Sequence, residues 1–196
     1  MLQDGYFDKI LDTQCFDLRA VESLREDPRH LEISTIRYAS PGVKNAAVNS
    51  LDVVILGGTQ IDTSFNVNVH TTSDGRIMGG SGGHTDCAAG AKLSMILSPL
   101  VRQRLPIVVD KVNCISTRGD YVDVFVSQYG IAVNPRRKEL VDRLRDKGFP
   151  IMEIEELWQK ARTICGEPRR VEAHGRPVAI VLDRNGSQQD IIRKKE

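Results

Sequence analysis

GGSGGHTDCAAGA, which spans residues 79–91, is the most constrained stretch of the chain, because four glycines in five positions lead into a short run of alanines. Glycines at this density permit positive φ values and let a ligand approach the backbone N–H groups without interference from Cβ atoms. Thr85 is predicted to cap the following helix and Asp86 to lie in its first turn, so the loop would end at a positive helix dipole. Such a loop suits an anion or a developing oxyanion. A plain strand-to-helix turn explains the pattern equally well, and no nucleotide-binding motif matches it.

The composition is that of an ordinary globular protein without a marked charge. The chain has 196 residues, 40% of them hydrophobic, which suffices for one domain with its own core. Its net charge of +1 indicates neither nucleic acid nor an anionic membrane as a partner. The apolar runs are too short to span a bilayer, so we expect a soluble, cytoplasmic protein. Its four cysteines form no CxxC pair and no histidine stands at zinc-ligand spacing, which predicts free thiols and no metal site.

The first fifty residues carry mainly helical and turn signals. We expect a brief helix over residues 6–11, and a second one that Asp17 caps and Asp27-Pro28 ends. His30 follows this stop and is assigned no role. Residues 38–42 contain proline and glycine and predict a turn.

The middle of the chain is predicted to be rich in strands. Residues 51–56 are nearly all apolar, which is typical of a parallel strand buried on both faces. Between residues 60 and 70 valines alternate with polar residues, so Asn66 and Asn68 should share one face of a strand. That face would meet a polar ligand, the glycine loop or water. Further strands are expected over residues 93–97, 105–109 and 122–126.

The last third of the chain is predicted to hold two helices and a hairpin. Asn134-Pro135 supplies an N-cap and first-turn pair for a helix that closes at Gly148, and a second helix is centred on residues 155–164. Residues 176–192 predict a hairpin around Asn185-Gly186. We therefore expect a single domain over residues 1–196, with an α/β core over 1–150 and a helix with a hairpin over 151–196.

Four segments together resemble consecutive motifs of the citrate lyase alpha subunit family: residues 51–56, 61–69, 80–91 and 130–137. The resemblance implies an α/β fold, the Rossmann-like CoA-transferase sandwich with a mostly parallel sheet. Members of the family are more than twice as long, so we expect a C-terminal part that lacks the first strand and helix of its domain. Three places depart from the family pattern, namely Gln60, Arg118 and the polar run 187–189.

The resemblance also implies an activity: citrate CoA-transferase, which exchanges acetate for citrate on the thiol of acyl carrier protein. The expected partners are the beta subunit, the gamma subunit (the acyl carrier protein), the missing N-terminal part of the alpha subunit, citrate and acetate. No tightly bound cofactor is expected, since the phosphoribosyl-dephospho-CoA prosthetic group belongs to the carrier. The alternative is a non-catalytic ligand-binding or scaffold remnant of the same fold. A sugar-phosphate isomerase would need acid and base residues that we do not find.

The site residues follow from the loop and from the resemblance. The family is thought to react in a ternary complex without a covalent glutamyl thioester, and we identify no covalent nucleophile. His84 would either bind a citrate carboxylate or orient the loop, Asp86 is favoured as a helix residue over a catalytic acid, and Cys87 as a packing residue over a reactive thiol. The predicted oxyanion donors are Gly80, Gly82 and Gly83, and the predicted substrate or thioester contacts are Gly79, Ser81, His84, Asn66, Asn68 and Asp86.

Overall fold

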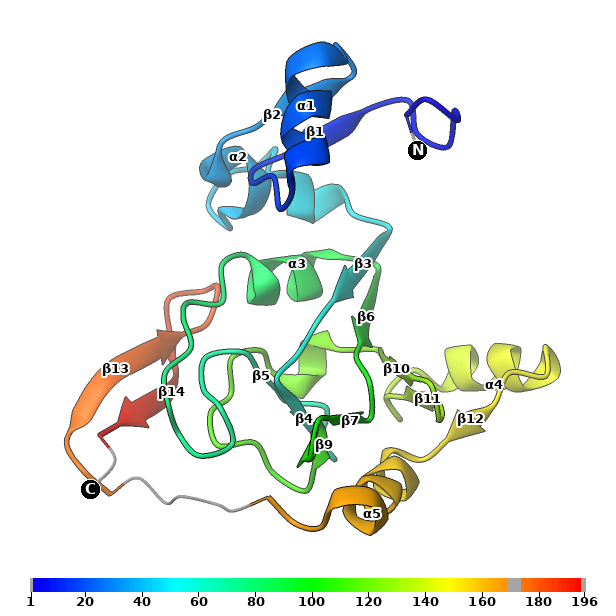
Figure 1. Cartoon of the computed structure of the whole chain (residues 1–196), viewed down its shortest axis with the longest axis vertical. Coiled ribbons are helices and arrows are strands. Elements are labelled where there is room, and N and C mark those ends of the chain that lie inside the picture. Colours follow the sequence, from blue (N-terminus) through cyan, green and yellow to red (C-terminus); the bar gives the residue numbers. More distant parts are fainter. Residues whose placement is uncertain (1, 169–173, 195–196) are drawn as a thin grey trace. The chain divides into compact units, whose positions relative to one another are not determined.

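A computed structural model describes residues 2–168 and 174–194 (Figure 1). The chain divides into two compact units, Met1–Asn49 and Ser50–Glu196, which we call unit 1 and unit 2. The hydrophobic pattern of the sequence gives no sign of this division.

Unit 1 is a small parallel strand pair with short helices. β1 and β2 pair in parallel, with Ile10 opposite His30, and Asp17 caps α1 by accepting the N–H of Ala20 at 2.8 Å. The capped helix is thus confirmed, whereas the helix predicted over residues 6–11 is wrong, because β2 offers Ile10 a strand partner. The turn expected over residues 38–42 begins only after α2. The elements are β1 (Ile10–Asp12), α1 (Leu18–Glu26), β2 (His30–Glu32), α2 (Thr35–Ala39) and the 3-10 helix η1 (Ala47–Ser50).

Unit 2 is built on a mixed, mostly parallel sheet with the order β12-β11-β10-β6-β3. β3, β6 and β10 run parallel, β10 and β11 form an antiparallel hairpin, and β12 adds a parallel edge. Helix α3 (His84–Gly90) lies between β3 and β6 in the chain and packs against both (Figure 1). This arrangement confirms the predicted α/β class. The sheet strands are β3 (Val53–Leu56), β6 (Leu93–Leu97), β10 (Val124–Ser127), β11 (Gly130–Val133) and β12 (Ile151–Met152).

β3 corrects one prediction, since it is an edge strand and is not buried on both faces. Its single neighbour in the described part of the chain is β6, and the side chains of Val53 and Ile55 are 49% and 61% exposed. An apolar run alone does not distinguish a central strand from an edge strand that lacks a cover.

The strand predicted over residues 60–70 is interrupted. β4 (Gln60–Asp62) and β5 (Val67–Asn68) pair as antiparallel neighbours, and β9 (Val108–Val109) extends this small sheet. Between them the Asp62 carboxylate accepts the N–H groups of Ser64 and Asn66, and Phe65 takes a φ of 63°. The carboxylate thereby holds a tight turn that alternation in the sequence does not reveal. The strand predicted over 105–109 is likewise split, into β8 (Leu105–Pro106), which pairs with β7 (Val101–Arg102), and β9.

The C-terminal elements are largely as predicted. α5 (Ile154–Cys165) ends at Gly166, and β13 (Pro177–Leu182) pairs with β14 (Gln188–Arg193) around Gly186, whose φ is 81°. Asn134 is not the cap of α4 (Lys138–Asp146), which begins after Arg137. The Asn134 amide instead donates to the carbonyls of Gly119 and Val122, so a tertiary contact replaces the predicted cap.

The hydrophobic core of unit 2 lies between the main sheet, the small sheet and α5. Leu157 and Ala161 of α5 are fully buried, and α5 packs against β8, β9 and β11. None of the helices in the described ranges is long and apolar enough to cross a membrane. The buried residues of this core are Ile61, Phe65, Val67, Ile96, Leu100, Val108, Val122, Phe125, Ala132, Ile154, Leu157 and Ala161.

Candidate functional site

The glycine loop lies open in front of α3. Gly79, Gly80 and Gly82 are exposed, nothing lies within 4 Å of a Cβ built on any of them, and Gly82 has a φ of 55°. Within residues 2–168 and 174–194, the N–H groups of Gly80, Gly82 and Gly83 have no protein acceptor. The loop therefore offers backbone donors at a surface where a ligand can approach closely.

Helix α3 begins one residue earlier than the predicted Thr85 cap. Gly83 is the N-cap residue and makes no side-chain bond, while Asp86 lies in the first turn as predicted. Thr85 is buried inside the first turn, where its hydroxyl donates to the Ser116 carbonyl at 2.6 Å. Its side chain is thus used in a tertiary contact, which explains why the predicted cap is wrong.

His84 anchors the loop to the end of β3. Its Nε2 lies 2.8 Å from the carbonyl oxygen of Gly57, the residue that follows β3, and its Nδ1 lies 2.7 Å from Oγ1 of Thr117. His84 is 9% exposed, and this burial lowers the pKa of its side chain below the usual value. Both nitrogens have protein partners, which is the geometry of a residue that orients the loop. Binding of a citrate carboxylate by His84 stays a prediction.

Asp86 belongs to a charged cluster below the loop. Burial raises the pKa of its carboxyl group, and its Oδ1 atom lies 3.9 Å from Nε of Arg184 without a hydrogen bond. Asp183, the neighbour of Arg184, accepts a hydrogen bond from the Tyr121 hydroxyl at 2.9 Å. The hairpin of β13 and β14 thereby brings a cation to the first turn of α3. Cys87, beside Asp86, is buried with an exposed fraction of 1%.

Asn66 and Asn68 have different partners. The Asn66 side chain donates to Asp62 and accepts the N–H of Gly119 at 2.9 Å, whereas the fully buried Asn68 donates to the carbonyl and hydroxyl of Thr71. Asn66 also lines a polar cavity of about 320 Å³ in unit 2. Its amide therefore has access to a ligand, while the amide of Asn68 holds the backbone. The other lining residues are Ser64, Ile115, Arg118, Gly119, Asp120, Asp183, Ser187, Gln188 and Gln189.

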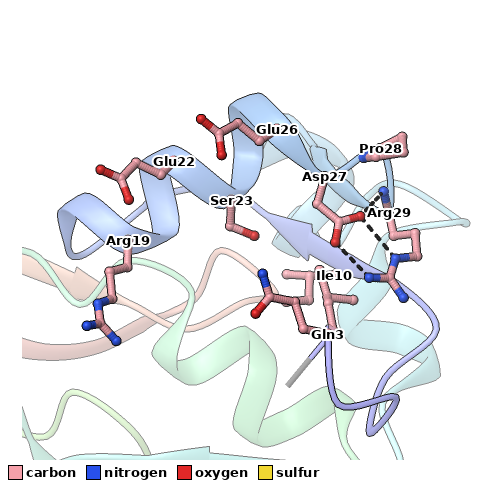
Figure 2. Close-up of a pocket in the computed structure, with 10 residues that line it drawn as sticks. Gln3, Ile10, Arg19, Glu22, Ser23, Glu26, Asp27, Pro28 and Arg29 are labelled. Carbon is pink, nitrogen blue, oxygen red and sulfur yellow. Dashed lines mark hydrogen bonds and ion pairs between the residues drawn. The ribbon is translucent and has the colours of Figure 1, made fainter.

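A larger cavity, of about 790 Å³, lies within unit 1 (Figure 2). Figure 2 shows Arg19, Glu22 and Glu26 on α1 along one side, and the ion pair of Asp27 with Arg29 at the other. Its charges are of both signs, and none of the site residues predicted from sequence lines it. The cavity thus indicates no particular ligand.

The residues that sequence reasoning missed are those contributed by distant segments. The first turn of α3 is contacted from positions 27 to 98 residues away along the chain, by Gly57, Ser116, Thr117 and Arg184. Small polar loop residues of this kind carry no local pattern, so only the folded chain reveals them.

The model of the family citrate lyase, alpha subunit, matches residues 1–195. The chain belongs to this family. It is 51% identical to the citrate lyase alpha chain of Klebsiella pneumoniae over 192 residues, and 47% identical to that of Escherichia coli (strain K12) over 192 residues. The family predicted by resemblance is thereby confirmed.

A solved structure of a family member supports the fold. The structure of the citrate lyase alpha subunit of Streptococcus mutans, in complex with citrate, matches this chain with a TM-score of 0.93 and 46% identity. The match covers the whole length of this chain. The predicted fold class, an α/β fold of the CoA-transferase type, is confirmed by this match. The chain spans only 38% of the length of each of these relatives.

Proposed function

We propose that the chain contributes the glycine-loop part of an acyl-transfer site, which exchanges acetate for citrate on the thiol of acyl carrier protein. The observation that carries this proposal is the open loop 79–83 before α3, in a member of the citrate lyase alpha subunit family. The N–H groups of Gly80, Gly82 and Gly83 in this loop have no acceptor among the described residues. That a family member was solved in complex with citrate supports citrate as the substrate.

The reaction would proceed in two balanced steps. A citrate carboxylate oxygen attacks the acetyl thioester carbonyl, and the tetrahedral intermediate expels the carrier thiolate to leave an anhydride of citrate and acetate. The thiolate then attacks the citryl carbonyl, the C–O bond to acetate breaks, and citryl carrier protein and acetate are formed. Each step places negative charge on a carbonyl oxygen, and the N–H groups of Gly80, Gly82 and Gly83 would stabilise it. Losing one donor of this kind costs about 3 kcal/mol in characterised enzymes.

The remaining predicted residues have distinct parts in this proposal. His84 fixes the loop to the end of β3, and Asn66 with Gly79 and Ser81 would contact the substrate or the pantetheine arm of the carrier. Asp86 would help to position the loop from the first turn of α3. Asn68 would help to position it by holding the backbone near Thr71. The prosthetic group, the beta and gamma subunits and the rest of the alpha subunit would complete the assembly.

The test measures exchange in a reconstituted assembly. The chain is mixed with the upstream region of an alpha subunit, acetylated carrier protein and citrate, and citryl carrier protein is detected by mass spectrometry. We expect exchange with the unmodified chain and a loss of about 10- to 100-fold with Gly80→Ala, since a methyl group in the loop misplaces the thioester. Gly42→Ala is the matched control, because Gly42 also has open space around it and lies in unit 1.

Three outcomes decide against the proposal. No exchange by a folded, complete assembly would contradict it, and saturable citrate binding without turnover would favour a non-catalytic ligand-binding role. An equal loss of exchange activity in both glycine variants would show that the glycine loop has no specific part in the reaction.

A further inference from the structure

We propose that unit 1 binds a zinc ion through Asp12, Cys15 and His30. One donor atom from each of these side chains lies within 4.8 Å of the other two. Asp12 ends β1 and His30 begins β2, and the parallel pairing of these two strands brings the two residues close together. Cys15 lies in the irregular segment between β1 and α1, where its Sγ donates to Oδ2 of Asp12.

The distances between the donor atoms suit a tetrahedral ion. Oδ2 of Asp12 lies 3.4 Å from Nε2 of His30 and 3.2 Å from Sγ of Cys15. Ligands at the usual zinc distances, about 2.1 Å for N and O and about 2.3 Å for S, stand about 3.4 to 3.6 Å apart around a tetrahedron. The third pair, Sγ of Cys15 and Nε2 of His30, lies within 4.8 Å, so the three donors surround one position on three sides.

His30 points to a ligand independently of the cluster. Its side chain is 4% exposed, and its buried Nε2 atom makes no hydrogen bond to any described residue, although the Asp12 carboxylate lies in ion-pair range at 3.4 Å. A buried polar atom that makes no hydrogen bond is costly in a folded protein. Its other nitrogen, Nδ1, lies 3.0 Å from the Ser23 hydroxyl of α1. An outer partner on one ring nitrogen is the usual arrangement for a histidine that binds metal through the other.

The donor set favours zinc over the hard cations. One nitrogen, one sulfur and one carboxylate oxygen suit a borderline-soft ion, whereas magnesium and calcium require several oxygen ligands. Binding replaces the thiol proton of Cys15, which leaves to solvent, with a zinc–sulfur bond. Asp12 and Cys15 are half-buried, so an ion can enter, and a fourth position stays open to water.

Unit 1 would gain stability from such a bond. Its buried hydrophobic side chains among the described residues are Leu2, Ala39, Ala46 and Val48, whereas eight of its large apolar side chains are exposed: Tyr6, Phe7, Leu11, Phe16, Leu18, Val21, Leu31 and Ile36. Small units with so little core commonly depend on metals, disulfides or association.

The test titrates the tag-free, chelator-treated chain of 196 residues with Zn²⁺, and separately with Co²⁺. We expect one ion per chain, release of about one proton per zinc at neutral pH, and a thiolate-to-cobalt charge-transfer absorption. Cys15→Ser should abolish this absorption and weaken zinc binding by at least about 100-fold, and Ser23→Ala should weaken it by about 10- to 100-fold. Cys165→Ser is the matched control, since Cys165 is equally half-buried but bonded to the Ala161 carbonyl.

Asp12→Asn serves as a second variant, and circular dichroism verifies that each variant is folded. Loss of binding in folded Asp12→Asn with retention in Cys165→Ser would support the site. The proposal is overturned if no stoichiometric ion binds, if Cys15→Ser keeps the absorption, or if the control loses it equally. None of these readouts depends on acyl transfer.

Discussion

His84 shows how one side chain can determine the position of a whole loop. The Gly57 carbonyl can only accept, so Nε2 carries the proton, and in the neutral ring Nδ1 accepts from the hydroxyl of Thr117. The two hydrogen-bond partners therefore determine the tautomer of His84. The neutral ring is favoured because burial opposes the charged form.

The stability of the fold should therefore depend on His84 below neutral pH. Its pKa is lowered in the folded state, so the unfolded chain binds the proton more readily, and stability falls as the pH drops below the unfolded value of about 6.5. We expect His84→Gln to cost about 1–3 kcal/mol at pH 8 and to remove part of the loss of stability below about pH 6.5. Urea unfolding at several pH values measures both. An unchanged pH dependence in the variant would contradict the assignment.

The four thiols should differ in reactivity. Burial, with the nearby charge of Asp190, raises the pKa of Cys114 to about 12, and Cys87 is 1% exposed. Cys15 and Cys165 are half-buried and, in the chelator-treated chain, should react first with iodoacetamide near pH 8. Peptide mass spectrometry over time gives the order. Early alkylation of Cys114 in the folded chain would show that the environment around β14 is open.

At the scale of elements, Gly119 fixes the loop that meets α3. A Cβ at this position would lie 1.9 Å from the Ser64 carbonyl oxygen, and its N–H bonds the side chain of Asn66. We expect Gly119→Ala to destabilise unit 2 by more than about 3 kcal/mol, whereas Gly80→Ala, in open space, should stay within about 0.5 kcal/mol. Denaturant unfolding compares the two variants. Similar stabilities of the two variants would mean that the loop after β9 can shift to accommodate a Cβ atom at residue 119 at little cost.

Elements whose determinants are local could be predicted from the sequence. Asp17 caps α1, Gly166 ends α5 and Gly186 turns the hairpin, and each acts on residues within a few positions of itself. The failures at residues 6–11 and at Asn134 have the opposite cause, because β2 and Gly119 supply partners that no local pattern contains. The same holds for the candidate site. Its glycine loop could be predicted from the sequence, whereas its contacts to Thr117 could not.

At the scale of the whole molecule, the free edge of β3 predicts association. Ile55 is 61% exposed on a strand with a single described neighbour. We expect Ile55→Glu to weaken binding to the upstream region of an alpha subunit, or self-association, by at least about tenfold while changing stability by less than about 1 kcal/mol. Sedimentation velocity measures the association. Leu182→Glu is the matched control, with 59% exposure on β13; an equal effect of both changes would argue against the β3 edge.

The contact between His84 and Gly57 has a consequence for regulation. Gly57 follows β3 directly, so a polypeptide that pairs with β3 also fixes the carbonyl to which the loop is bonded. Under the proposed function, correct placement of the oxyanion donors would then be coupled to subunit assembly.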